Sequence, residues 1–175
     1  MKKIAAVLPV LSAFLLTSQM VHAHNFKQQS ELDNFATEFQ LQYALTSNFQ
    51  DTPSQFSATI TLHNLSKLDL KQGNWQLYLH SVRKLDTMEQ QGLTIEHVQG
   101  DLHRISPSKN FQGIKSGQQL VVPIKGSPWI VSYTDFMPRA FITAGSLKPA
   151  VIKNTDTEQL ADFVAPFTKP EQQYR

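Results

Sequence analysis

The chain has 175 residues, enough for one domain with its own hydrophobic core, and no cysteine, which excludes a disulfide framework and thiolate chemistry. Its 16 Lys and Arg residues and 14 Asp and Glu residues give a formal net charge of +2, and two of the lysines lie in an expected leader. The mature chain is therefore close to neutral and has no basic run, so nucleic acid is not an expected partner.

Residues 1–23 have the features of a secretory signal peptide. Two lysines open the segment, Ile4–Leu16 is mostly apolar, and Val21–Ala23 supplies small residues at the cleavage positions. The apolar run is too short for a membrane span, which needs about 20 residues. We therefore expect cleavage after Ala23, export to the periplasm or the medium, and no membrane attachment of the mature chain.

Residues 24–34 are polar and predict a lead-in with at most a short helical turn. The region 35–152 then alternates apolar and polar residues in short runs, the period-two pattern of strands with one buried face. The predicted strands are Phe39–Thr46, Phe56–His63, Gly73–Ser81, Leu93–Val98, Leu102–Ile105, Leu120–Ile124, Trp129–Thr134 and Arg139–Thr143. Because Gly or Pro separates most of these runs, the pattern predicts an all-β antiparallel β-sandwich.

Four details of this region carry specific expectations. Gln99–Asp101 reads as a hairpin turn, and Pro123 indicates a sheet edge or a bulge because proline cannot donate to a strand ladder. Arg83–Gln91 reads as a loop or one helical turn. On Gly73–Ser81, Trp75 lies on the apolar side of the alternation, so we expect it in the core rather than on a sugar-binding surface.

The last part of the chain, 153–175, is predicted to be a short helix and a linker. Thr155 and Glu158 form a capping box, which predicts a helix over Asp156–Val164 that Pro166 ends.

Sequence motifs for catalysis, metals and cofactors are missing. The five histidines beyond the leader, at positions 24, 63, 80, 97 and 103, lack the i, i+4 spacing of a helical metal site and are expected on the surface, so no metal site is predicted. Nucleophile elbows, phosphate loops and dinucleotide fingerprints are absent, as is an adjacent Asp–Glu pair, so no catalytic residue and no cofactor are predicted.

One group could serve a carbohydrate site. Trp129 and Tyr133 fall on one face of a predicted strand, and Asp135 and Arg139 follow at a proline-containing turn. Sugars stack on aromatic rings, and Asp and Arg bind their hydroxyls, so these four residues are the candidate carbohydrate-binding residues. The alternative is that the two aromatic residues lie in the core with Val131, and that Asp135 and Arg139 form a salt bridge that holds the turn.

Four segments together resemble the N-terminal domain of bacterial chitobiases and related β-N-acetylhexosaminidases. They are GNWQLYLHSVRK, HVQGDLHRISPSKNFQGIKSGQ, PWIVSYTDFMPRAFITAG and IKNTDTEQLADFVAPFT. The resemblance runs from Phe35 to Thr168 and implies a β-sandwich similar to cellulose-binding modules, placed ahead of a catalytic barrel. The Asp–Glu pair of that barrel, within its His-x-Gly-Gly-Asp-Glu motif, is not present in these residues, so the family's catalytic residues match no position here.

The resemblance implies a non-catalytic carbohydrate-binding module with chitin-type oligosaccharides of N-acetylglucosamine as ligands. The chain would then be either a fragment of a longer product or a free-standing copy of the module. The alternative function is a structural domain that packs on and stabilises the glycoside hydrolase catalytic domain without binding sugar. An exposed aromatic strip would favour the first function, and an exposed apolar patch would favour the second.

Overall fold

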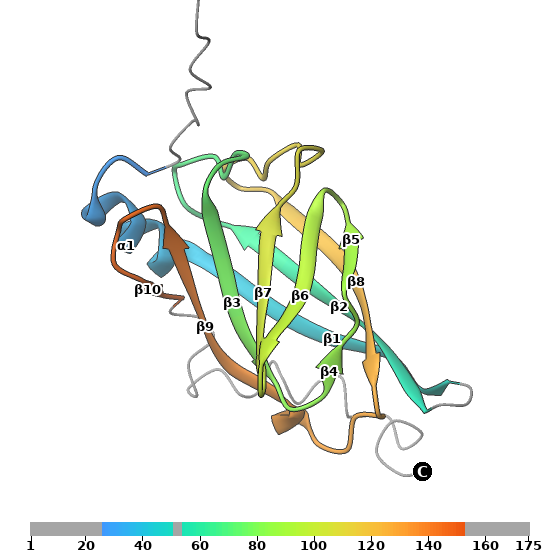
Figure 1. Ribbon diagram of the computed structural model, residues 1–175. Helices are drawn as coiled ribbons and strands as arrows, with labels where there is room; N and C mark the ends of the chain where they lie inside the picture. The colour runs from blue at the N-terminus through green and yellow to red at the C-terminus, as the bar shows by residue number, and fades with distance from the viewer. Residues whose placement is uncertain (1–25, 51–53, 153–175) are drawn as a thin grey trace, which may run out of the picture.

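The chain folds into two antiparallel sheets packed face to face, which confirms the predicted β-sandwich (Figure 1). The computed structural model describes residues 26–50 and 54–152. The four-stranded sheet has the order β1-β2-β8-β4, with β1 Phe39–Gln50, β2 Gln55–Asn64, β8 Gln119–Ser127 and β4 Lys84–Leu85. The six-stranded sheet has the order β10-β9-β3-β7-β6-β5, with β10 Ala150–Val151, β9 Phe136–Ala144, β3 Trp75–Ser81, β7 Leu102–Pro107, β6 Leu93–Gln99 and β5 Met88–Gln90.

The core lies between the two sheets and is built from the alternate side chains of each strand that point to the inside of the sandwich. Every second residue of β2 and β3 is buried, as the sequence pattern predicts. Trp75 is 1% exposed and its indole Nε1 donates to the backbone oxygen of Lys71 at 2.8 Å, so its predicted core position is confirmed. Its ring meets Phe111 edge to face, and toward the other end Tyr43 stacks on Phe136.

The expectation of a polar lead-in before the first strand was wrong. Helix α1, Gln29–Glu38, occupies this segment and packs beside β10 at one end of the sandwich (Figure 1). Its buried residues Leu32, Phe35 and Ala36 are spaced i, i+3 and i+4, which places them on one helix face. Phe35 also contacts the rings of Phe26 and Phe39, so the helix covers the open end of the core.

Two further segments differ from the sequence prediction. The stretch expected to be a loop or helical turn supplies the short strands β4 and β5. The predicted strand Trp129–Thr134 is instead a loop that leads into the 3-10 helix η1, Tyr133–Asp135. Here the carboxylate of Asp135 accepts hydrogen bonds from the backbone N–H groups of Val131 and Ser132, so these groups bond locally and not to a neighbouring strand.

The expectations for Pro123 and the hairpin are confirmed. Pro123 lies where β8 pairs with β2 on one side only, since β4 joins at Gly126 and Ser127. A Cβ atom on Gly126 would lie 2.6 Å from the backbone oxygen of Lys84 and 2.6 Å from the Phe56 ring, so this position requires glycine. The turn at Gly100 and Asp101 joins β6 to β7 as an antiparallel hairpin.

The expected leader 1–23 and the expected helix Asp156–Val164 lie outside the described residues. Within 26–50 and 54–152, no helix combines the length and the apolar character needed to cross a membrane.

Candidate functional site

The outer face of the six-stranded sheet is open, and no other described element covers it (Figure 1). Strands β3, β7 and β6 lie side by side at its centre, and β9 continues it on the far side of β3. Most outward positions of these strands are half-buried because each side chain is flanked by its neighbours on the adjacent strands, whereas Val98 and Arg139 are exposed. This face therefore presents a continuous surface of ordered side chains to solvent.

Four outward side chains form one line across four strands, which we call the cross-strand row. The register pairs Phe141 of β9 with Tyr78 of β3, Tyr78 with Arg104 of β7, and Arg104 with Glu96 of β6. Neighbouring strands lie about 4.8 Å apart, so the row is about 14 Å long. Two aromatic rings occupy one half and an ion pair occupies the other.

The aromatic half is a stacked pair. The Tyr78 and Phe141 ring centroids are 4.8 Å apart and their planes differ by 9°. The Tyr78 hydroxyl donates to Oε1 of Gln76, the preceding outward residue of β3, at 2.7 Å. These contacts fix the orientation of the Tyr78 ring and place its hydroxyl beside the Gln76 amide.

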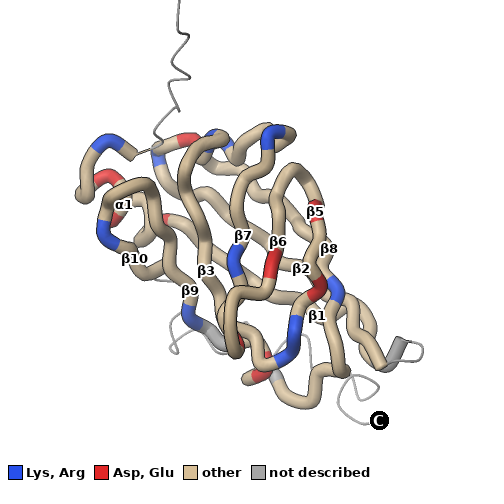
Figure 2. Tube along the Cα trace, in the orientation of Figure 1, with Lys and Arg blue, Asp and Glu red and all other residues tan. Residues whose placement is uncertain are grey.

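The charged half is an arginine–glutamate pair. Arg104 Nε donates to Glu96 Oε1 at 2.7 Å, and Arg104 Nη2 donates to the same oxygen. The hydrogen bond to Glu96, followed by the one to Tyr78, raises the pKa of Arg104 above its ordinary value. Both charged side chains remain 34% exposed. Figure 2 shows a basic position on β7 beside an acidic position on β6. The row thus offers both a cationic donor and an anionic acceptor to a ligand from solvent.

Of the sequence-predicted site residues, Asp135 has contacts that fix its place in the structure. Asp135 is only 7% exposed and accepts from Arg83 Nε at 2.9 Å, so its salt-bridge partner is Arg83 and not Arg139, which the alternative interpretation named. Asp135 Oδ2 also accepts from the backbone N–H of Val131 at 2.8 Å. Asp135 therefore holds the loop in place and is not available to a ligand.

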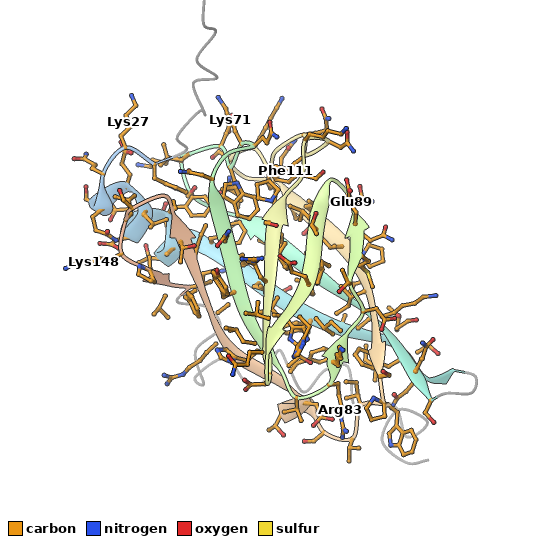
Figure 3. All side chains as sticks on the ribbon, in the orientation of Figure 1. Lys27, Lys71, Arg83, Glu89, Phe111 and Lys148 are labelled. Carbon is orange, nitrogen blue, oxygen red and sulfur yellow. The ribbon has the colours of Figure 1, made fainter. Side chains whose placement is uncertain are left out.

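The loop around Asp135 has a second attachment. The Asn48 side chain donates to the backbone oxygen of Ile130 at 2.8 Å and accepts from its N–H at 3.0 Å. Ile130 is buried, whereas Val131, for which a core position was the alternative expectation, is 60% exposed. Figure 3 shows Arg83 at this end of the sandwich, opposite the end with Lys71 and Phe111.

The remaining candidates come from different elements. Trp129 is half-buried in the loop, and the side chain of Tyr133 lies outside the described part of the structure. Arg139 is exposed on β9, where it has the same parity as Phe141 and lies on the outer face of the six-stranded sheet. Arg139 therefore shares a face with the cross-strand row.

The histidine expectation was wrong at one position. His103 is fully buried on β7, where its Nε2 accepts from the backbone N–H of Leu85 at 3.1 Å. Its Nδ1 must then carry the proton and donate to the backbone oxygen of Asp101 at 3.0 Å. Burial lowers the pKa of His103. Among the described residues, no group of three or more His, Asp and Glu side chains could hold a metal ion.

The cross-strand row was missed from sequence although part of its signal was visible. Alternation along β3 already places Tyr78 on the solvent side, opposite Trp75. What the sequence does not show is the register that brings Phe141 and Arg104 to either side of it, because these residues are 63 and 26 positions away. Nor does it show that Arg83 pairs with Asp135.

Comparison with known proteins gives a consistent picture. A family model described as "Putative carbohydrate binding domain" matches residues 23–175. The chain is similar to N,N'-diacetylchitobiase of Vibrio harveyi, with 31% identity over 150 residues that make up 78% of this chain and 17% of that protein. It is also similar to beta-hexosaminidase of Vibrio vulnificus, with 28% identity over 150 residues, 80% of this chain and 18% of that protein.

The chain thus spans less than a fifth of the length of these two relatives. Among solved structures, it is similar to the glycoside hydrolase family 20 exo-β-N-acetylglucosaminidase of Vibrio harveyi in complex with N-acetylglucosamine. The TM-score is 0.51 and the identity 19%, and the match covers 66% of this chain and 17% of that one. At this identity the likeness shows a shared fold.

Proposed function

Because the chain belongs to the family described as "putative carbohydrate binding domain", we propose that it is a non-catalytic module that binds chitin-type oligosaccharides of N-acetylglucosamine. The relatives named for chitobiose and hexosamine hydrolysis support this ligand class. We place the binding site on the outer face of the six-stranded sheet.

The observation that carries this placement is the cross-strand row. A sugar ring has apolar C–H faces and a rim of hydroxyl and acetamido groups, so its recognition needs an apolar surface beside directional hydrogen-bonding groups. Tyr78 and Phe141 supply the first, and the guanidinium of Arg104 with the carboxylate of Glu96 supplies the second. On this face these groups stand next to one another in a fixed register.

Arg139 extends the proposed site, since it lies on the same face of β9 as Phe141. Trp129 lies in the loop before η1 and not on a strand of this sheet. A contribution of Trp129 to sugar binding is therefore a separate hypothesis, for which Trp129→Ala is the test.

Titration calorimetry with soluble N-acetylglucosamine oligomers tests the proposal. Tyr78→Ala removes the central aromatic ring of the row and should weaken binding at least tenfold. Thr61→Ala is the matched control, because Thr61 is an outward residue at the centre of the other sheet and should leave the affinity unchanged. Equal affinities of the wild type and Tyr78→Ala, with both folded, would contradict the placement of the site.

The chain should also be catalytically silent. No adjacent Asp–Glu pair occurs in its sequence, and its family is one of binding domains. We expect no release of chromophore from an aryl N-acetylglucosaminide between about pH 4 and 9. Turnover above that of a mock purification, lost when the chain is removed by an affinity tag, would show that it is an enzyme.

A second candidate function is docking on a glycoside hydrolase catalytic domain. Val82 and Val131 are 52% and 60% exposed, and the backbone N–H groups of both bond to Asp135. The two valines form an exposed apolar surface, here called the apolar tip, whose backbone is fixed by these hydrogen bonds. The related proteins are more than five times longer than the matched segment. If this tip is the docking surface, Val131→Glu should abolish co-elution with the catalytic region of a related hexosaminidase, while sugar binding persists.

A further inference from the structure

The physical form of the carbohydrate can be inferred from the geometry of the cross-strand row, and this step rests on the function proposed above. We infer that the site takes a single hydrated oligosaccharide chain and not the flat surface of a packed, insoluble polysaccharide. A packed surface is recognised by several ring faces that lie in one plane, whereas a single chain can be held by groups that stand up from the sheet.

The aromatic rings of this face do not form a plane. Two rings lying side by side in one plane cannot have centroids only 4.8 Å apart, so the parallel rings of Tyr78 and Phe141 must overlap. Each therefore covers one face of the other, and mainly ring edges are left for solvent. A ligand can meet the flank of this pair, but it cannot lie across two open ring faces.

Neither tryptophan occupies an outward strand position of this face. Trp75 is 1% exposed on the inner side of β3 and packs against Phe111 at 5.5 Å between ring centroids. Trp129 lies in the loop between β8 and η1, which is not part of the sheet. The two largest aromatic side chains of the chain therefore do not come from outward strand positions of the six-stranded sheet.

The charged half of the row also favours a hydrated chain. Arg104 and Glu96 are each 34% exposed, so water still solvates the pair. Covering both charges with a packed, largely C–H surface would remove that water without replacing its hydrogen bonds. The hydroxyl and acetamido groups of one chain can instead bond to the guanidinium and the carboxylate while water remains around them.

The twist of the sheet also favours a single flexible chain. Neighbouring strands are rotated by about 20–25°, so the surface under a row of four strands turns by roughly 60–75° from end to end. A rigid flat surface cannot follow such a turn, whereas a flexible chain can. Laid along the row, a chain would pass from the aromatic pair to the ion pair over about 14 Å.

Two assays on the same purified protein test this inference. The first is calorimetric titration with soluble N-acetylglucosamine oligomers of increasing length. We expect affinity to rise with length and to level off once the chain spans the row. Glu96→Gln, which removes the anionic acceptor but keeps the side-chain shape, should weaken binding at least fivefold with an unchanged melting temperature. An unchanged affinity would show that the ion pair does not bind the chain and would overturn the inference.

The second assay measures depletion of the protein from solution by crystalline chitin powder. Crystalline chitin should deplete the wild-type protein no more than it depletes the Tyr78→Ala variant, or excess soluble oligomer should fully reverse the depletion. Depletion that soluble oligomer does not reverse would overturn the inference and leave the proposed function standing. Binding to neither form of the sugar would contradict the proposed function itself.

Discussion

Trp75 is the largest of the fully buried side chains, and its removal should destabilise the whole domain. Truncation of a core Trp typically costs about 3–5 kcal/mol, a large part of the 5–15 kcal/mol by which domains are usually stable. Trp75→Ala should therefore unfold at a much lower denaturant concentration than the wild type, or fail to fold. Val98→Ala, at an exposed position of β6, is the control and should change stability by no more than about 0.5 kcal/mol.

A melting temperature for Trp75→Ala equal to that of the wild type would show that the indole is not a core group.

At the scale of single residues the sequence was most informative for Trp75 and Tyr78, because period-two alternation alone placed them on opposite faces of the same strand. It was least informative for His103, which has inward parity on a short strand and carries no sequence signal of its bond to Leu85.

His103 makes stability depend on pH. The neutral ring of His103 accepts a hydrogen bond from the backbone N–H of Leu85, and burial lowers its pKa. His97, whose ring centroid lies 5.1 Å away, and His80 also disfavour the charged form, whereas Asp101 favours it. Above its unfolded pKa of about 6.5, both states hold the neutral ring. As the pH falls below this value, the unfolded state binds the proton first, so the free energy of unfolding should decrease toward the lower folded pKa.

Denaturant titrations between about pH 7.5 and 5 measure this effect. His103→Gln supplies an amide oxygen that can accept from Leu85 in place of Nε2 and does not titrate, so its stability should fall less steeply with decreasing pH than that of the wild type. Parallel curves for the two proteins would show that His103 is not the group responsible.

At the scale of elements, the loop before η1 depends on one carboxylate. Asp135 accepts hydrogen bonds from Arg83 and from the N–H groups of Val131 and Ser132, and hydrogen bonds to charged groups contribute about 1.5–3 kcal/mol each. Asp135→Ala should therefore lower stability by on the order of 2–3 kcal/mol and leave oligosaccharide affinity unchanged, since the cross-strand row lies elsewhere. Thr134→Ala, in the same turn but exposed, is the control for urea denaturation. Lost affinity at full stability would instead place Asp135 in the binding site.

The strands and the loops differed in how well they could be predicted. Long strands such as β2 and β3 carry five and four buried residues in strict alternation, so their pattern is unambiguous. Helix α1 has only three buried residues among ten, and its role as a cover for the core depends on contacts with β10 and β9 that are distant in sequence. The segment 129–134 alternates like a strand, but Asn48 and Asp135 bind the backbone of this segment instead.

For the whole molecule, the fold class followed from the pattern and the proposed site did not. A sandwich places two open faces in solvent, and only the pairing order of the strands decides which side chains meet on each. Phe141, Tyr78, Arg104 and Glu96 come from three separate stretches of sequence and meet because β9, β3, β7 and β6 are neighbours.

Export also concerns the whole molecule. We predict that the mature chain begins at His24, because residues 1–23 have the charge, apolar run and small cleavage residues of a signal peptide. N-terminal sequencing of protein from the periplasm or medium measures this directly. Protein that retains Met1 in those fractions would contradict the prediction.

The central claim is that the outer face of the six-stranded sheet binds carbohydrate. The most direct test is to map the amide chemical shifts of the labelled protein during titration with a soluble N-acetylglucosamine oligomer. We predict that saturable shifts will centre on Tyr78, Arg104 and Glu96 and extend to β9, with the outward positions of β1, β2 and β8 unaffected. Shifts confined to the four-stranded sheet or to the loop around Trp129, or none at saturating sugar, would contradict the claim.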